Sequence, residues 1–396
     1  MNTHSNIVHG KTKKDTIPRE PNGVYNLISL VALLSIFRYL IEDYKDYGLI
    51  MKIPLRELTL RDSLFFTLNF LISLAFSLLC FAVERSRVGK VGKKEKPLPP
   101  SSFYTFIFIV FLASLNLATV FVCYFYIEHV YISGWALISS VVVSVKLLSF
   151  FLVSNELQIT LDLRHFLYFL VCPTLCYQSQ YPMNETRRYK RIALRAVQLI
   201  GGVFLFVFVM DQYSISSIYR AIENNDYLIK IENTINVAIS TAFLFLIFFH
   251  MVFVCALDII AEITLFQDRQ FYQSWWNSTT VGEFWSLWNI PVHNCFKRHL
   301  YIPLIKNGTS KQVARAYCFF VSAVLHEFVL SVATKKFCGW VFLGMIFQIP
   351  NIYVSELVNK HIPSLANYFF WCSFCVIGQP TIVILYYRSK YLRSIE

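Results

Sequence analysis

Charged residues are scarce in this chain. They make up 15% of its 396 residues, whereas hydrophobic residues make up 56% and the mean hydropathy is +0.51. Soluble domains contain roughly 25% charged residues. A soluble protein with so apolar a composition could not cover its own surface with polar groups. The composition therefore excludes an ordinary soluble protein and predicts an integral membrane protein.

Several common patterns are also missing. The ten cysteines follow no spacing that is typical of a disulfide framework or a metal site. Cys372 and Cys375 form a C-x-x-C, but they lie in an apolar segment, where cysteine packs as a small hydrophobic residue. No internal repeat and no cleavable signal peptide are apparent. Residues 1–23 are polar and basic, and we expect a disordered cytosolic tail there.

Long apolar segments, by contrast, are abundant. A transmembrane helix needs about 20 predominantly apolar residues. We expect an all-α polytopic membrane protein, with residues 24–387 as the membrane domain and 388–396 as a short tail. The predicted spans are nine, at 24–42, 63–84, 103–128, 132–154, 192–213, 233–266, 312–334, 337–358 and 364–387.

The basic residues predict the orientation in the membrane. If the N-terminus is cytosolic, the cytosolic segments hold 21 Lys and Arg residues and the opposite side holds 11. Because Lys and Arg favour the cytosolic side, we expect a cytosolic N-terminus and a lumenal C-terminus. The net charge of +12 also suits anionic headgroups or an anionic ligand. Nucleic acid is not expected, because the basic residues lie in short loops between the spans.

Two predicted cytosolic segments, 157–178 and 267–311, are too long and too apolar for ordinary loops. The second mixes many aromatic side chains with Lys297, Arg298 and His299. Aromatic residues beside cations are typical of helices that lie in the membrane interface. Composition alone leaves two interpretations open: a membrane-anchoring belt, or the floor of a site that takes a water-soluble ligand from the cytosol.

Polar residues within spans are costly and usually functional. The seventh span carries His326 and Glu327, and Ser322 lies one turn before the histidine on the same helix face. Glu327 points about 100° away, toward a neighbouring helix. Gln348 and Gln379 lie in the next two spans. These residues predict a polar chamber at membrane depth, although a hydrogen-bonded latch between helices is an alternative for each of them.

Asn289 and His293 lie before the seventh span, in Trp288-Asn-Ile-Pro-Val-His293. Pro291 makes this turn rigid. An asparagine near a catalytic histidine can orient the base or hold a carbonyl oxygen. The alternative is a helix cap followed by an interfacial histidine.

Together these motifs resemble those of the membrane-bound O-acyltransferases, most of all the diacylglycerol branch, with the sterol branch next. Phe271-Tyr-Gln-Ser-Trp-Trp-Asn277 is similar to the family's FYxDWWN, with Ser274 in place of the aspartate. The resemblance is strong from about residue 160 to 388. The other matching stretches are Trp288–His293, Arg298–Tyr301, Ser322–Glu327, Gln348–Pro350, Gly378–Pro380 and Pro173–Tyr177.

The resemblance implies transfer of a fatty acyl group from acyl-CoA to diacylglycerol, which yields triacylglycerol and CoA. It implies His326 as general base, supported by Glu327, and Asn289 as the residue that holds the acyl carbonyl. The implied substrate-binding residues are Gln348, Gln379, Ser322, Trp288 and His293. The implied acyl-CoA-binding residues are Tyr301, Lys311, Arg315, Phe271, Tyr272, Trp275, Trp276 and Asn277.

The resemblance further implies the endoplasmic reticulum membrane, a homodimer or homotetramer, and no metal or cofactor besides acyl-CoA as co-substrate. A sterol O-acyltransferase is the nearest alternative, since it would have the same fold and base. A membrane transporter is the alternative from another class, but transporters commonly carry internal repeats, and none is apparent here.

Overall fold

The computed structural model describes residues 59–89, 102–156 and 161–395, and seven separate positions: Leu30, Leu34, Arg38, Ile41, Tyr44, Lys45 and Gly48. The chain divides into two units, Met1–Ile50 and Met51–Glu396. The predicted tail at 1–23 and nearly all of the first predicted span lie outside the described residues. The second unit contains every predicted site residue, and its architecture follows.

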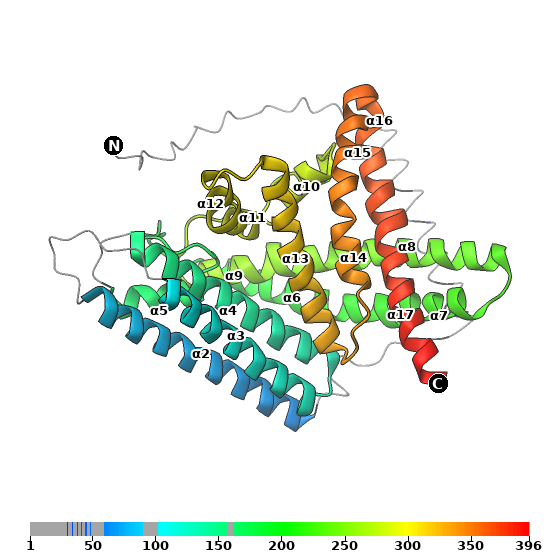
Figure 1. Cartoon of the computed structure of the whole chain (residues 1–396). Coiled ribbons are helices and arrows are strands. Elements are labelled where there is room, and N and C mark those ends of the chain that lie inside the picture. Colours follow the sequence, from blue (N-terminus) through cyan, green and yellow to red (C-terminus); the bar gives the residue numbers. More distant parts are fainter. Residues whose placement is uncertain are drawn as a thin grey trace. The chain divides into compact units, whose positions relative to one another are not determined.

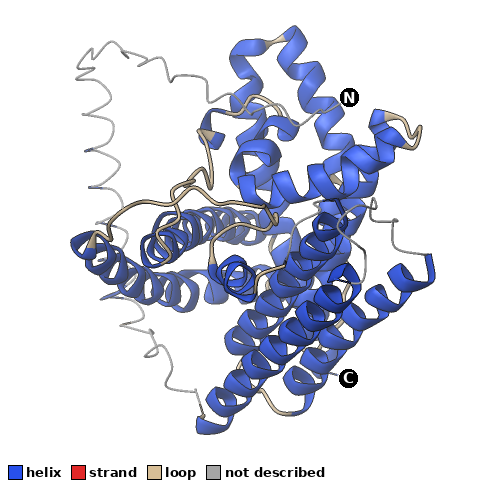
Figure 2. Ribbon diagram, turned by 90° about the vertical axis from the view of Figure 1, so that its left-hand side faces the viewer, coloured by secondary structure: helices blue, strands red, loops and turns tan. Residues whose placement is uncertain are grey.

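The second unit is helical, and its described residues form no strand (Figures 1 and 2). A lone β-bridge joins Met183 to Phe266. The α-helices are α2 (Leu60–Gly89), α3 (Ser102–Phe125), α4 (Val130–Glu156), α5 (Leu163–Val171), α6 (Tyr189–Val209), α7 (Ile215–Glu223), α8 (Tyr227–Phe249), α9 (Leu257–Ile263), α10 (Val281–Trp288), α11 (Ile290–Phe296), α12 (Ile302–Lys306), α13 (Lys311–Ala333), α14 (Trp340–Ile346), α15 (Gln348–His361), α16 (Pro363–Trp371) and α17 (Gln379–Ile395).

Short π-helical or 3₁₀ segments connect several of these helices. The π-helices are η1 (Met210–Ser214), η2 (His250–Ala256), η4 (Lys297–Tyr301) and η5 (Cys372–Gly378), and η3 (Trp275–Asn277) is a 3₁₀ turn. Because η1 joins α6 to α7, and η2 joins α8 to α9, each pair forms one long apolar helix. Such π-helical turns often mark functional sites in proteins.

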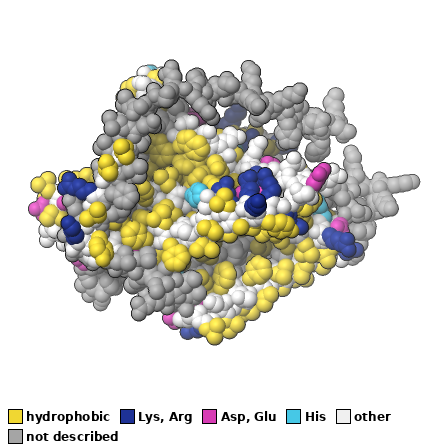
Figure 3. Space-filling model, turned by 180° about the vertical axis from the view of Figure 1, so that it is seen from behind, with side chains coloured by type: hydrophobic (Ala, Val, Ile, Leu, Met, Phe, Trp, Pro, Cys, Tyr) yellow, Lys and Arg dark blue, Asp and Glu magenta, His cyan; other side chains and the backbone are white. Residues whose placement is uncertain are grey.

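Among the described residues, eight helices are long and apolar enough to cross a membrane. Their ranges are Leu60–Arg87, Phe103–Phe125, Val130–Ser154, Tyr189–Glu223, Tyr227–Ile263, Lys311–Ala333, Trp340–His361 and Pro363–Ser389. Each coincides with one predicted span from the second to the ninth, which confirms the polytopic all-α fold. Hydrophobic side chains cover much of the face shown in Figure 3, as expected for a surface that faces lipid.

The first three described spans, α2, α3 and α4, lie side by side, and α4 also packs against α13 (Figure 1). Small polar residues join them: Thr119 donates to Asn69 Oδ1 over 2.8 Å and lies 3.0 Å from Ser140 Oγ. Asn116 donates to Ser144 Oγ over 2.8 Å. Hydrogen bonds between spans replace the hydrophobic driving force that lipid does not supply.

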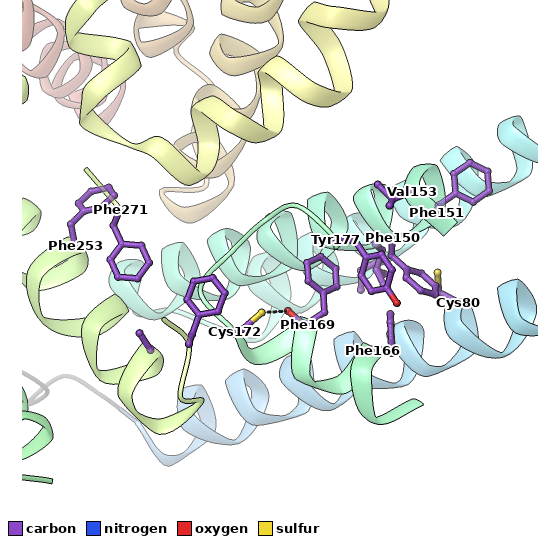
Figure 4. Close-up of a cluster of buried hydrophobic side chains, with 14 of the residues drawn as sticks. Cys80, Phe150, Phe151, Val153, Phe166, Phe169, Cys172, Tyr177, Phe253 and Phe271 are labelled. Carbon is purple, nitrogen blue, oxygen red and sulfur yellow. Dashed lines mark hydrogen bonds between the residues drawn. The ribbon is translucent and has the colours of Figure 1, made fainter. Parts of the chain in front are cut away.

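A buried lysine determines where the chain goes after α5. Lys146 of α4 is 4% exposed, and its Nζ donates to the carbonyls of Phe169, Leu170 and Cys172 at 2.8, 2.9 and 2.7 Å. These carbonyls close the C-terminal end of α5, where backbone acceptors lack helical partners and a cation is favoured. Figure 4 shows the adjoining core, in which Phe150 of α4 lies near Phe166 and Tyr177.

The segment 267–311 contains η3, α10, α11, η4 and α12, and it leads into α13. Polar residues begin its helices: Thr280 accepts from Glu283 N, and Ser310 accepts from Val313 N at the start of α13. The predicted short helices are therefore present. Their position in the membrane interface remains a prediction.

Candidate functional site

The aromatic motif at 271–277 is part of the core. Phe271 is 4% exposed and Trp275 is 2% exposed. The Trp275 ring contacts Phe249 of α8 and Trp288 of α10 at centroid distances of 4.9 and 5.4 Å. Burial of such large rings makes this motif a frame for the site. Trp276 is 45% exposed, which leaves its indole free to contact a ligand or lipid.

The frame holds two of the predicted motifs together. Gln273 N donates to Leu287 O, and Ile290 N donates to Phe271 O, both over 3.0 Å. These backbone bonds pair residues 271–273 with the end of α10 and the start of α11. Two stretches that are separate in the sequence are thus adjacent, with Asn289 at the junction.

Asn289 begins α11. Its backbone has φ −140°, and its Oδ1 accepts from Val292 N over 3.2 Å, with Pro291 in the first turn. Asn289 is therefore a helix cap, as the alternative interpretation proposed. The cap uses one lone pair of Oδ1, and the two N–H donors of Nδ2 remain for a substrate oxygen. His293 follows one turn later and is half-buried. Burial lowers the pKa of His293, and the nearby Lys297 lowers it further, so both effects favour the neutral imidazole.

The geometry of His326 defines which nitrogen can act as a base. His326 Nδ1 lies 2.8 Å from the backbone oxygen of Ser322, and 3.4 Å from its Oγ. A carbonyl oxygen only accepts, so Nδ1 carries the proton and Nε2 presents a lone pair. The side chain is exposed, and Nε2 can therefore meet a substrate hydroxyl. Ser322 orients the ring through its main chain, a role that side-chain patterns do not reveal.

Glu327 does not contact His326 in the way that the motif implied. Its carboxylate is buried and accepts from Gly339 N at 2.8 Å, Val341 N at 3.1 Å and Phe342 N at 3.0 Å. It also accepts from Ser331 Oγ at 2.7 Å. The carboxylate thus caps the start of α14, where free amides and the helix dipole favour an anion. The contacts match the predicted latch to a neighbouring helix, and they correct the expectation only where it implied direct contact between Glu327 and the base.

Gln348 and Gln379 both have buried amide oxygens without a hydrogen-bond partner among the described residues. Gln348 Nε2 donates to Gly344 O at 3.3 Å, which leaves its Oε1 unpaired. Helices α14 and α17 are close at this point. A Cβ added to Gly344 of α14 would lie 2.9 Å from the side chain of Ile382 of α17. Buried polar atoms are nearly always paired, so unpaired acceptors indicate a place for a polar ligand.

Trp285 of α10 was not predicted, and it has the same property. Its indole Nε1 is buried and has no partner in the described part of the chain. The ring lies 6.1 Å from Phe319 of α13 and 6.4 Å from Phe374 of η5. Phe319 lies two helical turns before His326, about 10 Å along the helix. Its type and position in an aromatic segment gave no sign of a role; only the unpaired donor does.

The residues predicted to bind the CoA end lie at the start of α13 and on η4, and these two elements pack together. Arg315 Nη1 forms an ion pair with Glu356 Oε1 of α15 at 3.3 Å, and both side chains are about half exposed. Lys311 is the first residue of α13, and Tyr301 is the last of η4. The partner of Arg315 is exposed and weakly held, so a phosphate can replace it.

A sequence model of the MBOAT, membrane-bound O-acyltransferase, family matches residues 160–387. The chain is 31% identical to "Diacylglycerol O-acyltransferase 1C" of Glycine max, in an alignment that covers 99% of this chain and 80% of that protein. It is 30% identical to "Diacylglycerol O-acyltransferase 1" of Arabidopsis thaliana, over 93% of this chain and 73% of that protein. A Dictyostelium discoideum protein with the same name is 35% identical over 60% of this chain and 38% of its own length.

Proposed function

Because this chain belongs to the membrane-bound O-acyltransferase family, we propose that it is an acyl-CoA:diacylglycerol O-acyltransferase. It transfers a fatty acyl group from acyl-CoA to the free hydroxyl of diacylglycerol, and the products are triacylglycerol and CoA. The thioester is already activated, so the protein must align the two substrates and remove a proton. The single observation that carries the residue assignment is the 2.8 Å contact between His326 Nδ1 and Ser322 O, because a carbonyl only accepts and the exposed Nε2 is then left as the base.

The proposed reaction has two steps. His326 Nε2 takes the hydroxyl proton while the diacylglycerol oxygen attacks the thioester carbonyl carbon. The tetrahedral intermediate then collapses, the carbon–sulfur bond breaks, and the imidazolium returns the proton to the CoA sulfur. Base catalysis of this kind contributes roughly 10²–10⁴ to the rate. The hydrogen bond from Nδ1–H to Ser322 O holds the tautomer throughout.

The unpaired polar atoms supply substrate contacts in this proposal. The Oε1 atoms of Gln348 and Gln379 accept hydrogen bonds from the hydroxyl end of diacylglycerol. Trp285 Nε1 donates a hydrogen bond to an ester or thioester oxygen. The Nδ2 group of Asn289 donates to the acyl carbonyl oxygen. Each of these contacts satisfies a group that otherwise costs free energy when it is buried. Glu327 contributes by fixing α14 against α13, not by touching the base.

The solubility of the two substrates explains the position of the site. Tyr301, Lys311 and Arg315 hold the phosphates and adenine of CoA at the cytosolic side, since phosphate pairs with Arg and Lys. The aromatic frame, which includes Phe271 and Trp275, borders the thioester end, and Tyr272, Trp276 and Asn277 complete that side. The acyl chain and diacylglycerol come from the bilayer. The proposed location is the endoplasmic reticulum membrane, with a cytosolic N-terminus, a lumenal C-terminus and a homodimer or homotetramer.

A competition assay tests the acceptor. Purified protein in detergent receives radiolabelled oleoyl-CoA with equal amounts of diacylglycerol and cholesterol, and the lipids are then separated. Label in triacylglycerol is the expected result. Label in sterol ester would show that the acceptor is a sterol, and the family and the role of His326 would be unchanged. Release of no CoA in either case would exclude the acyltransferase, and solute movement in liposomes would then point to a transporter.

A further inference from the structure

Three metal-ligating side chains converge at a place that the proposed reaction does not use. Cys176 follows α5, Cys295 lies on α11, and His299 lies on η4. Their sulfur and nitrogen atoms all lie within 4.8 Å of one another. Cys295 is 5% exposed, Cys176 is half-buried, and both thiols are free. The spacing of these residues along the chain does not predict the cluster, because the two cysteines are 119 positions apart.

The imidazole of His299 is held in place by a residue of α4. His299 Nε2 lies 2.8 Å from Ser149 Oγ, and Ser149 is fully buried. Ser149 Oγ also accepts from Tyr177 N at 2.8 Å, so it has a further lone pair for the imidazole N–H. With Nε2 donating to Ser149 Oγ, Nδ1 is the ring nitrogen that remains to bind an ion. Metal-binding histidines almost always have such a second partner, which sets the tautomer and the ring plane.

We infer that Cys176, Cys295 and His299 form a binding site for zinc, with water in the fourth position. Zinc prefers thiolate and imidazole ligands, with Zn–S near 2.3 Å and Zn–N near 2.0–2.1 Å. In a tetrahedron of that size the ligand atoms lie roughly 3.4–3.8 Å apart, which fits within the observed limit of 4.8 Å. Magnesium and calcium do not suit the site, because they require oxygen ligands. Two thiolates also neutralise the charge of the ion in a partly buried place.

A disulfide between the two cysteines is the competing chemistry for the same pair. The histidine distinguishes them, because an imidazole that lies within 4.8 Å of both sulfurs and contacts a buried serine has no part in a disulfide. The residue after Cys176 is held as well, because Arg298 Nη1 donates to Tyr177 O at 3.1 Å. The three ligands are therefore fixed by α4, α11 and η4 before any ion binds, which lowers the cost of ordering them.

The zinc has a structural role in this inference. It joins the loop after α5 to α11 and η4, the elements that carry Asn289, His293 and Tyr301. The metal takes no part in acyl transfer, and the site stands whether or not the acceptor is diacylglycerol. Loss of zinc therefore lowers the thermal stability of the protein, and the activity follows as the fraction of folded protein falls.

Metal content tests the inference directly. The full-length protein is purified in detergent through an affinity tag that chelates no metal, and zinc, copper and iron are measured by mass spectrometry. One zinc per chain is expected for the wild type, and most of it is lost in Cys176→Ser, Cys295→Ser and His299→Ala. Cys318→Ser, which changes another partly buried cysteine, keeps the full zinc content and serves as the matched control.

A second measurement needs no variant and therefore holds even where a variant fails to fold. Cobalt(II) replaces zinc in the wild-type protein, and thiolate-to-cobalt charge-transfer absorption together with visible tetrahedral bands is expected. Absence of zinc after incubation with zinc and of any cobalt spectrum would overturn the inference. Full zinc retention by Cys295→Ser, or a Cys176–Cys295 disulfide peptide in non-reduced digests, would overturn it as well.

Discussion

The helices α2–α4 and the helices α10–α17 differ in how some of their buried polar side chains are paired. In α2–α4, Asn69, Thr119 and Ser140 are buried at membrane depth and bond to one another. In the later helices, Trp285, Gln348 and Gln379 have buried polar atoms without partners in the described part of the chain. A buried polar group without a partner costs free energy, so the second group offers positions where a ligand could bind.

The contrast has exceptions, and they are informative. His129 Nδ1 and Ser133 Oγ, at the turn from α3 into α4, are also buried and unpaired. They lie where α4 begins, outside the motifs that carry the predicted site residues. A paired polar residue thus marks a helix contact, and the unpaired Trp285, Gln348 and Gln379 are the candidates for ligand contacts. The first kind of residue should affect stability when it is changed, and the second kind should affect turnover.

The largest effect is expected for His326→Ala. Removal of the base should lower turnover by about 10²–10⁴, while folding and acyl-CoA binding remain. Radiolabelled acyl transfer, measured beside size-exclusion profiles, checks this result. His250→Ala removes another exposed intramembrane histidine and is the control, with turnover near the wild-type value. Full activity in His326→Ala would sink the proposed mechanism.

On the satisfied side of the comparison, Lys146→Met should destabilise the protein most. The change removes a cation that three carbonyls share, and hydrogen bonds to charged groups contribute about 1.5–3 kcal/mol. We expect a lower midpoint in thermal unfolding, followed by tryptophan fluorescence in detergent. The matched control is Lys190→Met at an exposed position, which should leave the midpoint unchanged. An unchanged midpoint in Lys146→Met would show that these bonds contribute nothing net.

The unsatisfied side is tested by Gln379→Leu. Because its Oε1 has no partner within the described residues, the change should leave the unfolding midpoint unchanged or raise it slightly. The kcat/KM for diacylglycerol should fall about tenfold, which corresponds to one lost hydrogen bond of roughly 1.4 kcal/mol. Asn69→Leu is the comparison variant, because it removes a side chain that is hydrogen-bonded to Thr119. It should lower the stability and leave the turnover per folded molecule normal. If both variants lose only stability, the distinction between the two regions fails.

Glu327→Gln should have only a small effect on turnover. The amide oxygen still accepts from some of the α14 amides, but the charge that favours a helix start is lost, at a cost of about 0.3–2 kcal/mol. Turnover per folded molecule should stay within a few-fold of the wild type, as judged from activity normalised to monodisperse protein. A loss as large as that of His326→Ala would restore Glu327 to the catalytic role that its motif implied.

The sequence by itself determined the class of the protein and the places where chemistry was to be sought. Hydropathy predicted every described span, because a bilayer forces an apolar segment of about 20 residues into a helix. The motif around His326 predicted the base that we propose, and the aromatic segment at 267–311 predicted the short helices that the structure contains. Those properties depend on residues that are near one another along the chain.

Only the tertiary structure decided what each polar side chain contacts. Glu327 caps α14 and Asn289 caps α11, although the motif implied a role in orienting or holding reacting groups for both. The unpaired indole of Trp285, and the convergence of Cys176 and Cys295 across α5 and α11, follow no sequence pattern. The physical reason is that the partner of a buried polar group depends on which helices pack together, and this packing involves residues far apart in the chain.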